Sequence, residues 1–203
     1  MRIIYCIGLC LLFCNAVYGQ NKFKVEAIET GKWRKIYCLI DEKGNQIKQL
    51  DSALYQHTFD LDEYVYFAVF SKKGSGWVAI DEHENELFHV PNPVVDDWAP
   101  DYLVENKIRI IDKKNKIGFA NEKGEIIITP QFDIATSFNN GKAIIGQRCK
   151  KVHWEKHRKK DDCDHYSIVC HLNGYINENG TILKLGDYQF EDLIKEIDWK
   201  GSN

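Results

Sequence analysis

Cysteine and histidine side chains that could bind a metal or form disulfides gather in one segment near the C-terminal end of the chain. Seven of them lie between positions 149 and 171: Cys149, His153, His157, Cys163, His165, Cys170 and His171. Thiolate and imidazole groups are the usual ligands of zinc, so the segment is a candidate structural or hydrolytic metal site. Cysteines that face each other could instead form a disulfide in an oxidising compartment.

The spacing of these residues gives little support to a metal site. The segment contains no Cys-x-x-Cys pair. His153 and His157 could share one face of a helix, but Trp154 stands where the helix of a zinc protease places its glutamate. We therefore expect no metal, cofactor or catalytic residue. A metal-binding or hydrolytic protein that uses the Cys/His-rich insertion 149–171 is the alternative interpretation.

The same segment carries a dense run of charge. Six Lys and Arg side chains in "KKVHWEKHRKK" flank Glu155 and are followed by three aspartates. Loops that protrude from a rigid scaffold often carry recognition residues, so we expect an unknown protein or surface ligand of acidic character to bind here. The candidate binding residues are Lys150, Lys151, Trp154, Lys156, Arg158, Lys159 and Lys160. The whole chain has a formal net charge of −3, which disfavours nucleic acid and anionic membranes as partners.

The elements that must position this segment repeat along the chain. The stretches "LIDEKGNQI", "AIDEHENEL", "FANEKGEII" and "YINENGTIL" begin at Leu39, Ala79, Phe119 and Tyr175. They share an apolar residue, Asp or Asn, Glu, a turn and further apolar residues. The first three copies follow one another at a constant spacing of about 40 residues, which indicates a repeat architecture. The last interval is longer, and the excess over the repeat period indicates an insertion of about 16 residues.

Each copy predicts a β-hairpin. Gly44, Gly124 and Gly180 can adopt the positive φ that tight hairpin turns need, and we expect Asn85 to do so in the second unit. The flanking segments are rich in β-branched and aromatic residues, whereas "FEDLIKEI" near the C-terminus predicts one short helix. The fold class is therefore all-β, with tandem antiparallel hairpin or meander repeats of about 40 residues. The predicted units cover about 22–66, 67–107, 108–148 and 166–203, with an inserted loop at 149–165.

The third unit resembles the WG (Trp-Gly) repeat family. The matching positions are Ile117-Gly118-Phe119-Ala120-Asn121, Gly124, Pro130-Gln131-Phe132-Asp133, Ala135, Phe138 and Gly141-Lys142-Ala143. The fourth unit matches through Asn173-Gly174-Tyr175-Ile176-Asn177 and Gly180, and the first two units match less well. The resemblance implies an all-β repeat array, and it implies no catalytic residues because the functions of the family are mostly unassigned.

A single unit of three or four strands cannot bury its apolar face, so neighbouring units must stack and the end units become caps. We expect the recurring aromatic residues to form this core between units: Trp33, Tyr66, Phe67, Trp77, Trp98, Phe119, Phe132 and Phe138. The array could be propeller-like or open. Sequence-adjacent carboxylates, in the groups Asp60, Asp62, Glu63 and Asp96, Asp97, Asp101, are expected to lie in solvated turns.

Disulfide candidates are Cys38, Cys149, Cys163 and Cys170. If Cys149 lies opposite about Tyr166 in a long hairpin, the easiest bond is Cys149 to Cys163, and Cys149 to Cys170 is the next choice. A bond across a loop of about 15 residues contributes on the order of 3 kcal/mol. A bond from Cys38 to the fourth unit would require the ends of the array to meet.

The first nineteen residues read as a secretory signal peptide, with Arg2 before the apolar run "IIYCIGLCLLFC" and cleavage after Gly19. Residues 20–203 would then form one β-repeat domain that is secreted or periplasmic, with no transmembrane span after cleavage. A lipoprotein anchor is the less favoured alternative, because Cys10 and Cys14 each follow a large residue. The sequence thus predicts a non-enzymatic exported scaffold for protein or ligand binding.

Overall fold

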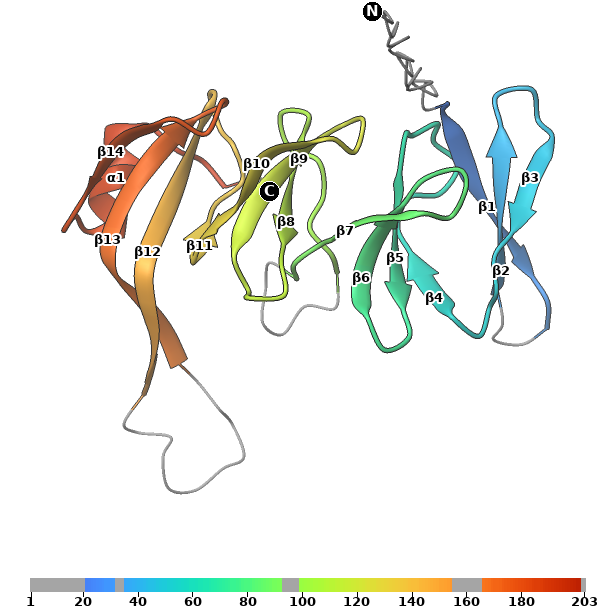
Figure 1. Cartoon of the computed structure of the whole chain (residues 1–203), viewed down its shortest axis with the longest axis horizontal. Helices are drawn as coiled ribbons and strands as arrows, with labels where there is room; N and C mark the ends of the chain where they lie inside the picture. The colour runs from blue at the N-terminus through green and yellow to red at the C-terminus, as the bar shows by residue number, and fades with distance from the viewer. Residues whose placement is uncertain (1–20, 32–34, 93–98, 155–165, 202–203) are drawn as a thin grey trace, which may run out of the picture.

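Three antiparallel sheets lie in a row in the computed structural model, which describes residues 21–31, 35–92, 99–154 and 166–201 (Figure 1). The predicted signal peptide, Trp33 and Trp98 lie outside these residues. The first sheet consists of β1 (Phe23–Glu29), β2 (Lys35–Asp41) and β3 (Gln46–Gln49). It stands at one end of the row, and the C-terminal sheet stands at the other.

The second sheet has seven strands in the order of the chain. They are β4 (Tyr55–Thr58), β5 (Ala68–Lys72), β6 (Gly76–Ile80), β7 (Glu86–His89), β8 (Lys107–Ile111), β9 (Ile117–Asn121) and β10 (Ile126–Phe132). The third sheet contains β11 (Ile134–Ala135), β12 (Lys142–His153), β13 (Tyr166–Asn177) and β14 (Ile182–Gly186). The predicted short helix is present as α1 (Phe190–Glu196).

Four three-stranded meanders follow one another: β1-β2-β3, β5-β6-β7, β8-β9-β10 and β12-β13-β14. The middle two share one sheet because β7 pairs with β8 at His89 and Ile111. The predicted all-β repeat fold is therefore confirmed. The described strands form an open row and no closed barrel.

The same five-residue turn closes five of the hairpins. In each, the side-chain oxygen of an Asp or Asn accepts the backbone N–H groups two and four residues further along, at 2.7–3.1 Å. Side chains of this kind stabilise turns because they replace backbone hydrogen bonds locally. The five first residues are Asp41, Asp81, Asp112, Asn121 and Asn177. The turn at Asp112 lies between the copies that the sequence repeat had revealed.

The fourth residue of this turn adopts a positive φ in every copy. Gly44, Gly124 and Gly180 hold values of 77–84°, as predicted. The prediction for the second unit was wrong, because Glu84 and not Asn85 adopts the left-handed conformation, with φ 68°. Asn85 follows it and donates its side-chain amide to Asp81 Oδ2 at 2.8 Å. Position in the turn therefore decides the conformation, even against residue preference.

The first turn of each unit differs from the second in position. The first turns of units two and three, at residues 73–75 and 112–116, lie on the same side of the row as the far end of the paired strands β12 and β13 (Figure 1). The turns from β9 to β10 and from β13 to β14 lie on the opposite side. The row consequently has one edge on which the turn varies from unit to unit.

Two glycines of the repeat allow strands to approach closely. A Cβ atom added to Gly118 would lie 2.3 Å from the Ile128 carbonyl oxygen, and one added to Gly174 would lie 1.9 Å from that of Lys184. Pairing with β10 is irregular between Ile128 and Phe132, where the backbone crosses Gly118. The glycine in these units therefore accommodates a neighbouring backbone.

Buried side chains gather between successive units, as predicted for a stacked array. Three clusters join units one and two, two and three, and three and four. Representative members, in that order, are Phe23, Leu39 and Phe70; Trp77, Phe88 and Ile110; and Phe119, Phe132 and Phe138. In a fourth cluster, Leu193 and Ile197 pack on Ile144 and so cap the last unit.

The predicted core aromatics largely occupy these clusters. Phe67, Trp77, Phe119, Phe132 and Phe138 are all buried. Tyr66 is half-buried instead, with the Lys22 ammonium 5.1 Å from its ring centroid. The aromatic residues that recur along the strands thus stabilise the contacts between units.

Candidate binding surface on the β12–β13 hairpin

The strands β12 and β13 extend beyond their neighbours. They pair from Lys142 and Asn177 to His153 and Tyr166. On the outer edges, β11 pairs with β12 only as far as Gly146, and β14 pairs with β13 only as far as Asn173. Residues 147–153 and 166–172 form a two-stranded stem that projects from the sheet, as Figure 1 shows. We call this segment the stem.

A disulfide joins Cys149 to Cys170 across the stem. The predicted register was wrong by four residues, because Cys149 lies opposite Cys170, and Tyr166 lies opposite His153. The first-choice bond from Cys149 to Cys163 is therefore excluded, and the second choice is present. The paired strands continue into the predicted insertion as far as His153. This longer pairing places Cys149 directly opposite Cys170.

Cys38 does not join the ends of the array. Its thiol is free and its side chain is only 1% exposed within β2. Burial raises the pKa of the Cys38 thiol, with a smaller contribution from Glu26. A buried thiol with a raised pKa behaves as a small apolar side chain and reacts slowly.

Asp133 fixes the base of the stem. Its Oδ2 accepts the N–H of Cys149 at 3.0 Å, and its other oxygen pairs with Lys116 Nζ. Arg148 lies just before Cys149 and has a positive φ of 54°, so the strand bends where the carboxylate binds. Burial by itself raises the pKa of Asp133, but the hydrogen bonds from Lys116 and Cys149 outweigh it and lower the pKa below its ordinary value.

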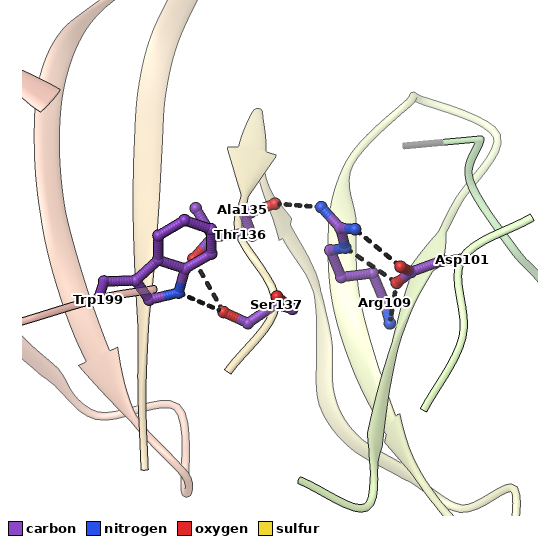
Figure 2. Close-up of polar contacts among 6 residues, drawn as sticks. All are labelled: Asp101, Arg109, Ala135, Thr136, Ser137 and Trp199. Carbon is purple, nitrogen blue, oxygen red and sulfur yellow. Dashed lines mark hydrogen bonds and ion pairs between the residues drawn. The ribbon is translucent and has the colours of Figure 1, made fainter. Parts of the chain in front are cut away.

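An ion pair with Asp101 positions Arg109, whose side chain links the sheet of the third unit to that of the fourth. Figure 2 shows the Arg109 guanidinium against Asp101, with Nε and Nη2 at 2.9 and 2.7 Å from the two carboxylate oxygens. Arg109 Nη1 also donates to the Ala135 carbonyl oxygen in β11, at 3.0 Å. The Asp101 side chain is 2% exposed and that of Arg109 is 18% exposed. Bidentate geometry of this kind fixes both partners.

The clustered carboxylates at residues 60–63 and 96–101 were predicted to lie in solvated turns. This prediction was wrong for Asp60 and Asp101. Both carboxylates are directed at backbone: Asp60 accepts the Val69 N–H at 2.7 Å, and Asp101 accepts that of Arg109 at 3.0 Å. Burial raises the pKa of Asp60 in spite of this hydrogen bond. In the next unit, Thr136 Oγ1 accepts the Ile144 N–H at 3.0 Å. Thr136 therefore holds the position that Asp60 and Asp101 hold in the preceding units, with a different side chain.

The C-terminal segment closes the same junction. Trp199 Nε1 donates to the Ser137 carbonyl oxygen at 2.9 Å, and the Thr136 hydroxyl donates to the same oxygen at 3.0 Å (Figure 2). The segment that follows α1 therefore packs back onto the chain between β11 and β12. These contacts fix the C-terminal segment on the sheet of the fourth unit.

The surface of the stem is basic on one strand and apolar on the other. Residues 147–153 contain Arg148, Lys150 and Lys151, all three exposed, and no Asp or Glu. Residues 166–172 contain no Lys, Arg, Asp or Glu. The exposed apolar side chains on and next to the stem are Val152, Trp154, Ile168 and Val169.

The predicted partner-binding residues are placed in part. Lys150 and Lys151 lie on β12, where the Lys151 ammonium is 4.2 Å from the Tyr166 ring centroid. Trp154 follows β12, is 49% exposed, and donates its indole N–H to Ser167 Oγ at 2.8 Å. Lys156, Arg158, Lys159 and Lys160 lie outside the described residues.

A groove of about 770 Å³ runs along the base of the stem. One wall consists of stem residues that include Arg148, Lys150 and Ile168, and the other wall is the segment from Asp187 to Glu191. Tyr188 and Phe190 contribute aromatic surface to that second wall. No pattern in the sequence indicated this groove, because it depends on where the chain turns after β14.

The predicted metal donors do not assemble in the part of the chain that the structure describes. Cys149 and Cys170 are bonded to each other and so have no thiolate to offer. His153 and His171 are exposed on different strands of the stem. His157, Cys163 and His165 lie outside the described residues, and no group of three suitable side chains occurs within them.

Sequence reasoning missed Asp133, Arg109 and Asp101 as positioning residues. Asp133 is one of the positions that match the WG repeat pattern, but the sequence did not indicate its hydrogen bond to Cys149, 16 residues away. That contact depends on the bend at Arg148. Aligning Asp60 and Asp101 as repeated positions could have indicated a shared structural role.

Among the described residues, no helix has the length and hydropathy of a membrane span.

Comparison with known families identifies a segment that runs from the third unit into the fourth. The family model for the WG containing repeat matches residues 117–148, which run from the start of β9 to the bend in β12. The matched segment therefore includes Gly118, the turn at Asn121, and Asp133. No match was found among curated proteins.

Proposed function

We propose that this β-repeat protein, which has a WG containing repeat at residues 117–148, is a non-enzymatic exported scaffold that binds an acidic protein segment through the β12 strand of the stem. The observation that carries the proposal is the stem itself. It leaves the sheet, a disulfide and Asp133 fix it, and it presents three exposed cations with no carboxylate on the same strand.

Charge supports an acidic partner. The chain has a net charge of −3, whereas residues 147–153 carry three positive charges. A local patch of opposite sign to the rest of the molecule directs an acidic partner to one place and repels it elsewhere. Val152 and Trp154 add apolar area next to these cations, and aromatic residues and Arg are enriched in interfaces.

Export is supported by the disulfide and by the predicted signal peptide. Disulfides persist in oxidising compartments and are rare in the cytosol. The Cys149–Cys170 bond fixes a surface element that would otherwise be a two-stranded hairpin, which is marginally stable in water by itself. An exported scaffold gains a rigid binding element in this way.

The test uses a fluorescent peptide of alternating Glu and Val as a probe, with an alternating Lys and Val peptide for comparison. We expect the purified protein to bind the acidic peptide in preference to the basic one, with an affinity that falls as salt is added. The variant K150E/K151E should bind it at least about tenfold more weakly, because two attractive charges become repulsive.

The matched control is K113E/K114E. These two lysines are exposed in the first turn of unit three, on the same side of the row, and the variant has the same net charge as K150E/K151E. It should bind the acidic peptide nearly as well as the wild type. Equal loss in both variants would mean that only overall charge matters, and equal binding of both peptides by the wild type would refute the proposal.

A further inference from the structure

Over the stem, no strand among the described residues lies beside the outer edge of β13. The strand β14 pairs with β13 from Ile176 to Asn173 and then ends at Gly186. Asn173 Nδ2 donates to the Tyr188 carbonyl oxygen at 2.8 Å, which fixes the point where the chain departs. Residues 166–172 therefore pair with β12 on one side, and no described strand covers the other side.

This edge lacks the features that usually protect edge strands. Natural sheets protect their edges with charged side chains, proline or bulges. The sequence "YSIVCHL" at 166–172 has no Lys, Arg, Asp, Glu, Pro or Gly. Ile168 and Val169 are 48% and 47% exposed. A segment of this length with high β-propensity and low charge pairs readily with another strand.

We propose that the edge of β13 at residues 166–172 pairs with the same edge of a second copy of the chain, antiparallel about a two-fold axis near Val169. A two-fold contact brings the same surface patch together from both subunits. Val169 is the middle residue of the seven, so it faces its own counterpart across the axis. The two β13 strands then continue one sheet through the dimer.

Charge selects this edge and this occupant. The β12 edge carries Arg148, Lys150 and Lys151, so pairing it with itself would place like charges together at a cost. The β13 edge itself carries no Lys, Arg, Asp or Glu, so self-pairing has no such cost there. A neutral, β-branched strand of the same sequence is the better match.

Space next to the edge is available at the base of the stem. The groove between the stem and the segment from Asp187 to Glu191 is lined by Ile168 and Val169 on one side and by Tyr188 and Phe190 on the other. These apolar side chains would be covered by an added strand. Strand addition to an exposed edge uses main-chain hydrogen bonds for affinity and adjacent pockets for specificity.

The dimer is independent of the proposed acidic partner. It uses β13, and the basic residues of β12 remain on the two outer edges of the shared sheet. A protein that dimerises and does not bind the acidic peptide would refute the proposed function alone. A monomer that binds the peptide would refute the dimer alone.

The test measures molar mass by light scattering during size exclusion, on purified protein with its disulfide intact. We expect the mass of two chains at high concentration and a shift toward one chain on dilution. V169K and V169E should each run as one chain, because the axis places two like charges together. An equimolar mixture of V169K and V169E should regain the mass of two chains, because Lys then faces Glu.

The control is V152K, which adds the same charge to an exposed valine on β12 of the same stem and should stay dimeric. A wild-type mass of one chain at every concentration would overturn the proposal, as would a dimer that survives V169K. Hydrogen exchange of the wild type tests it without a variant. Amides in residues 166–172 should exchange more slowly at high than at low protein concentration, and no difference would count against the contact.

Discussion

The carboxylate of Asp133 accepts the backbone N–H of Cys149 at 3.0 Å, one residue after the bend at Arg148. Asp133 stands between β10 and β11, and Cys149 is half of the stem disulfide. The third unit therefore fixes the direction in which the stem leaves the fourth unit. Stability and orientation of the stem are consequently linked to a residue of the repeat.

Replacing Asp133 with Asn should lower the free energy of unfolding by about 2 kcal/mol at pH 7, because a charged acceptor for Lys116 and Cys149 is lost. The pKa of Asp133 is lowered in the folded protein. Its stabilisation is therefore fully present above the unfolded pKa of about 4 and is lost as the pH falls through the lower folded pKa.

Urea unfolding of wild type and D133N at pH 7 and at a series of pH values below about 4 checks this prediction. The difference between the two proteins should shrink as the pH falls. D187N is the matched control at an exposed carboxylate, and it should change the free energy of unfolding at pH 7 by less than about 0.5 kcal/mol. A D133N difference that stays constant with pH would contradict the assigned role.

Peptide mapping of the oxidised protein should recover a cross-link between the peptides that contain Cys149 and Cys170. Cys38 should be alkylated only after unfolding, because its side chain is buried. Recovery of a link from Cys149 to Cys163 would show that the register of β12 and β13 is different. Rapid labelling of Cys38 in the native protein would contradict the burial of its side chain within β2.

Removing the cross-link with C149A/C170A should loosen the stem more than the rest of the array. The chain-entropy estimate for a loop of this size is about 3 kcal/mol. We expect faster hydrogen exchange and proteolysis at residues 147–153 and 166–172, with the amides of β9 protected as before. Uniformly faster exchange across β9 as well would mean that the bond stabilises the whole array.

Replacing Arg109 with Ala should lower the free energy of unfolding by about 3 kcal/mol, because the Asp101 carboxylate then stays buried without its partner. The control K195A removes an exposed cation that lies 4.0 Å from Asp192 and should change stability by less than about 0.5 kcal/mol. Chemical denaturation measures both. Equal, small effects would mean that the ion pair contributes little to the junction.

Replacing Gly118 with Ala should destabilise the protein by about 3 kcal/mol, because the added methyl group meets the backbone of β10. Gly44 provides the comparison, since a Cβ added there has no neighbour within 4 Å. At this position, only the positive φ of 84° disfavours a residue with a side chain. G44A should therefore cost about 1 kcal/mol. Thermal or urea unfolding that ranks G44A as the more harmful change would contradict the close-approach explanation.

The repeat could be predicted from the sequence because turn chemistry is local. Asp or Asn followed three residues later by a residue with positive φ specifies the same hairpin in each unit, and three glycines marked it. The turn at Asp112 was missed because it is the first turn of its unit and lies between the copies that recur about every 40 residues, with Asn115 and no glycine at its fourth position. Local patterns thus identified the meanders, but they left this first turn unrecognised.

The stem could be predicted in position but not in register. The longer last interval of the repeat indicated an insertion, and the cysteines indicated a cross-link, but nothing local decided between Cys163 and Cys170 as the partner of Cys149. The register follows from pairing that begins at Lys142 and Asn177, far from the cysteines. Contacts such as Arg109 with Ala135 depend on how units stack, which one sequence does not show.

The edge of the row on which the first turns lie can accept insertions of different length. The side chains that pack one unit against the next belong mainly to the strands, so a first turn can lengthen without altering the stacking. In unit four, the first turn is lengthened in this way, and the stem is the result. The short turn at residues 73–75, in the same place on unit two, is consequently a natural site for grafting a foreign recognition loop. Such a graft would project from the same side of the row as the stem, with the third unit between them.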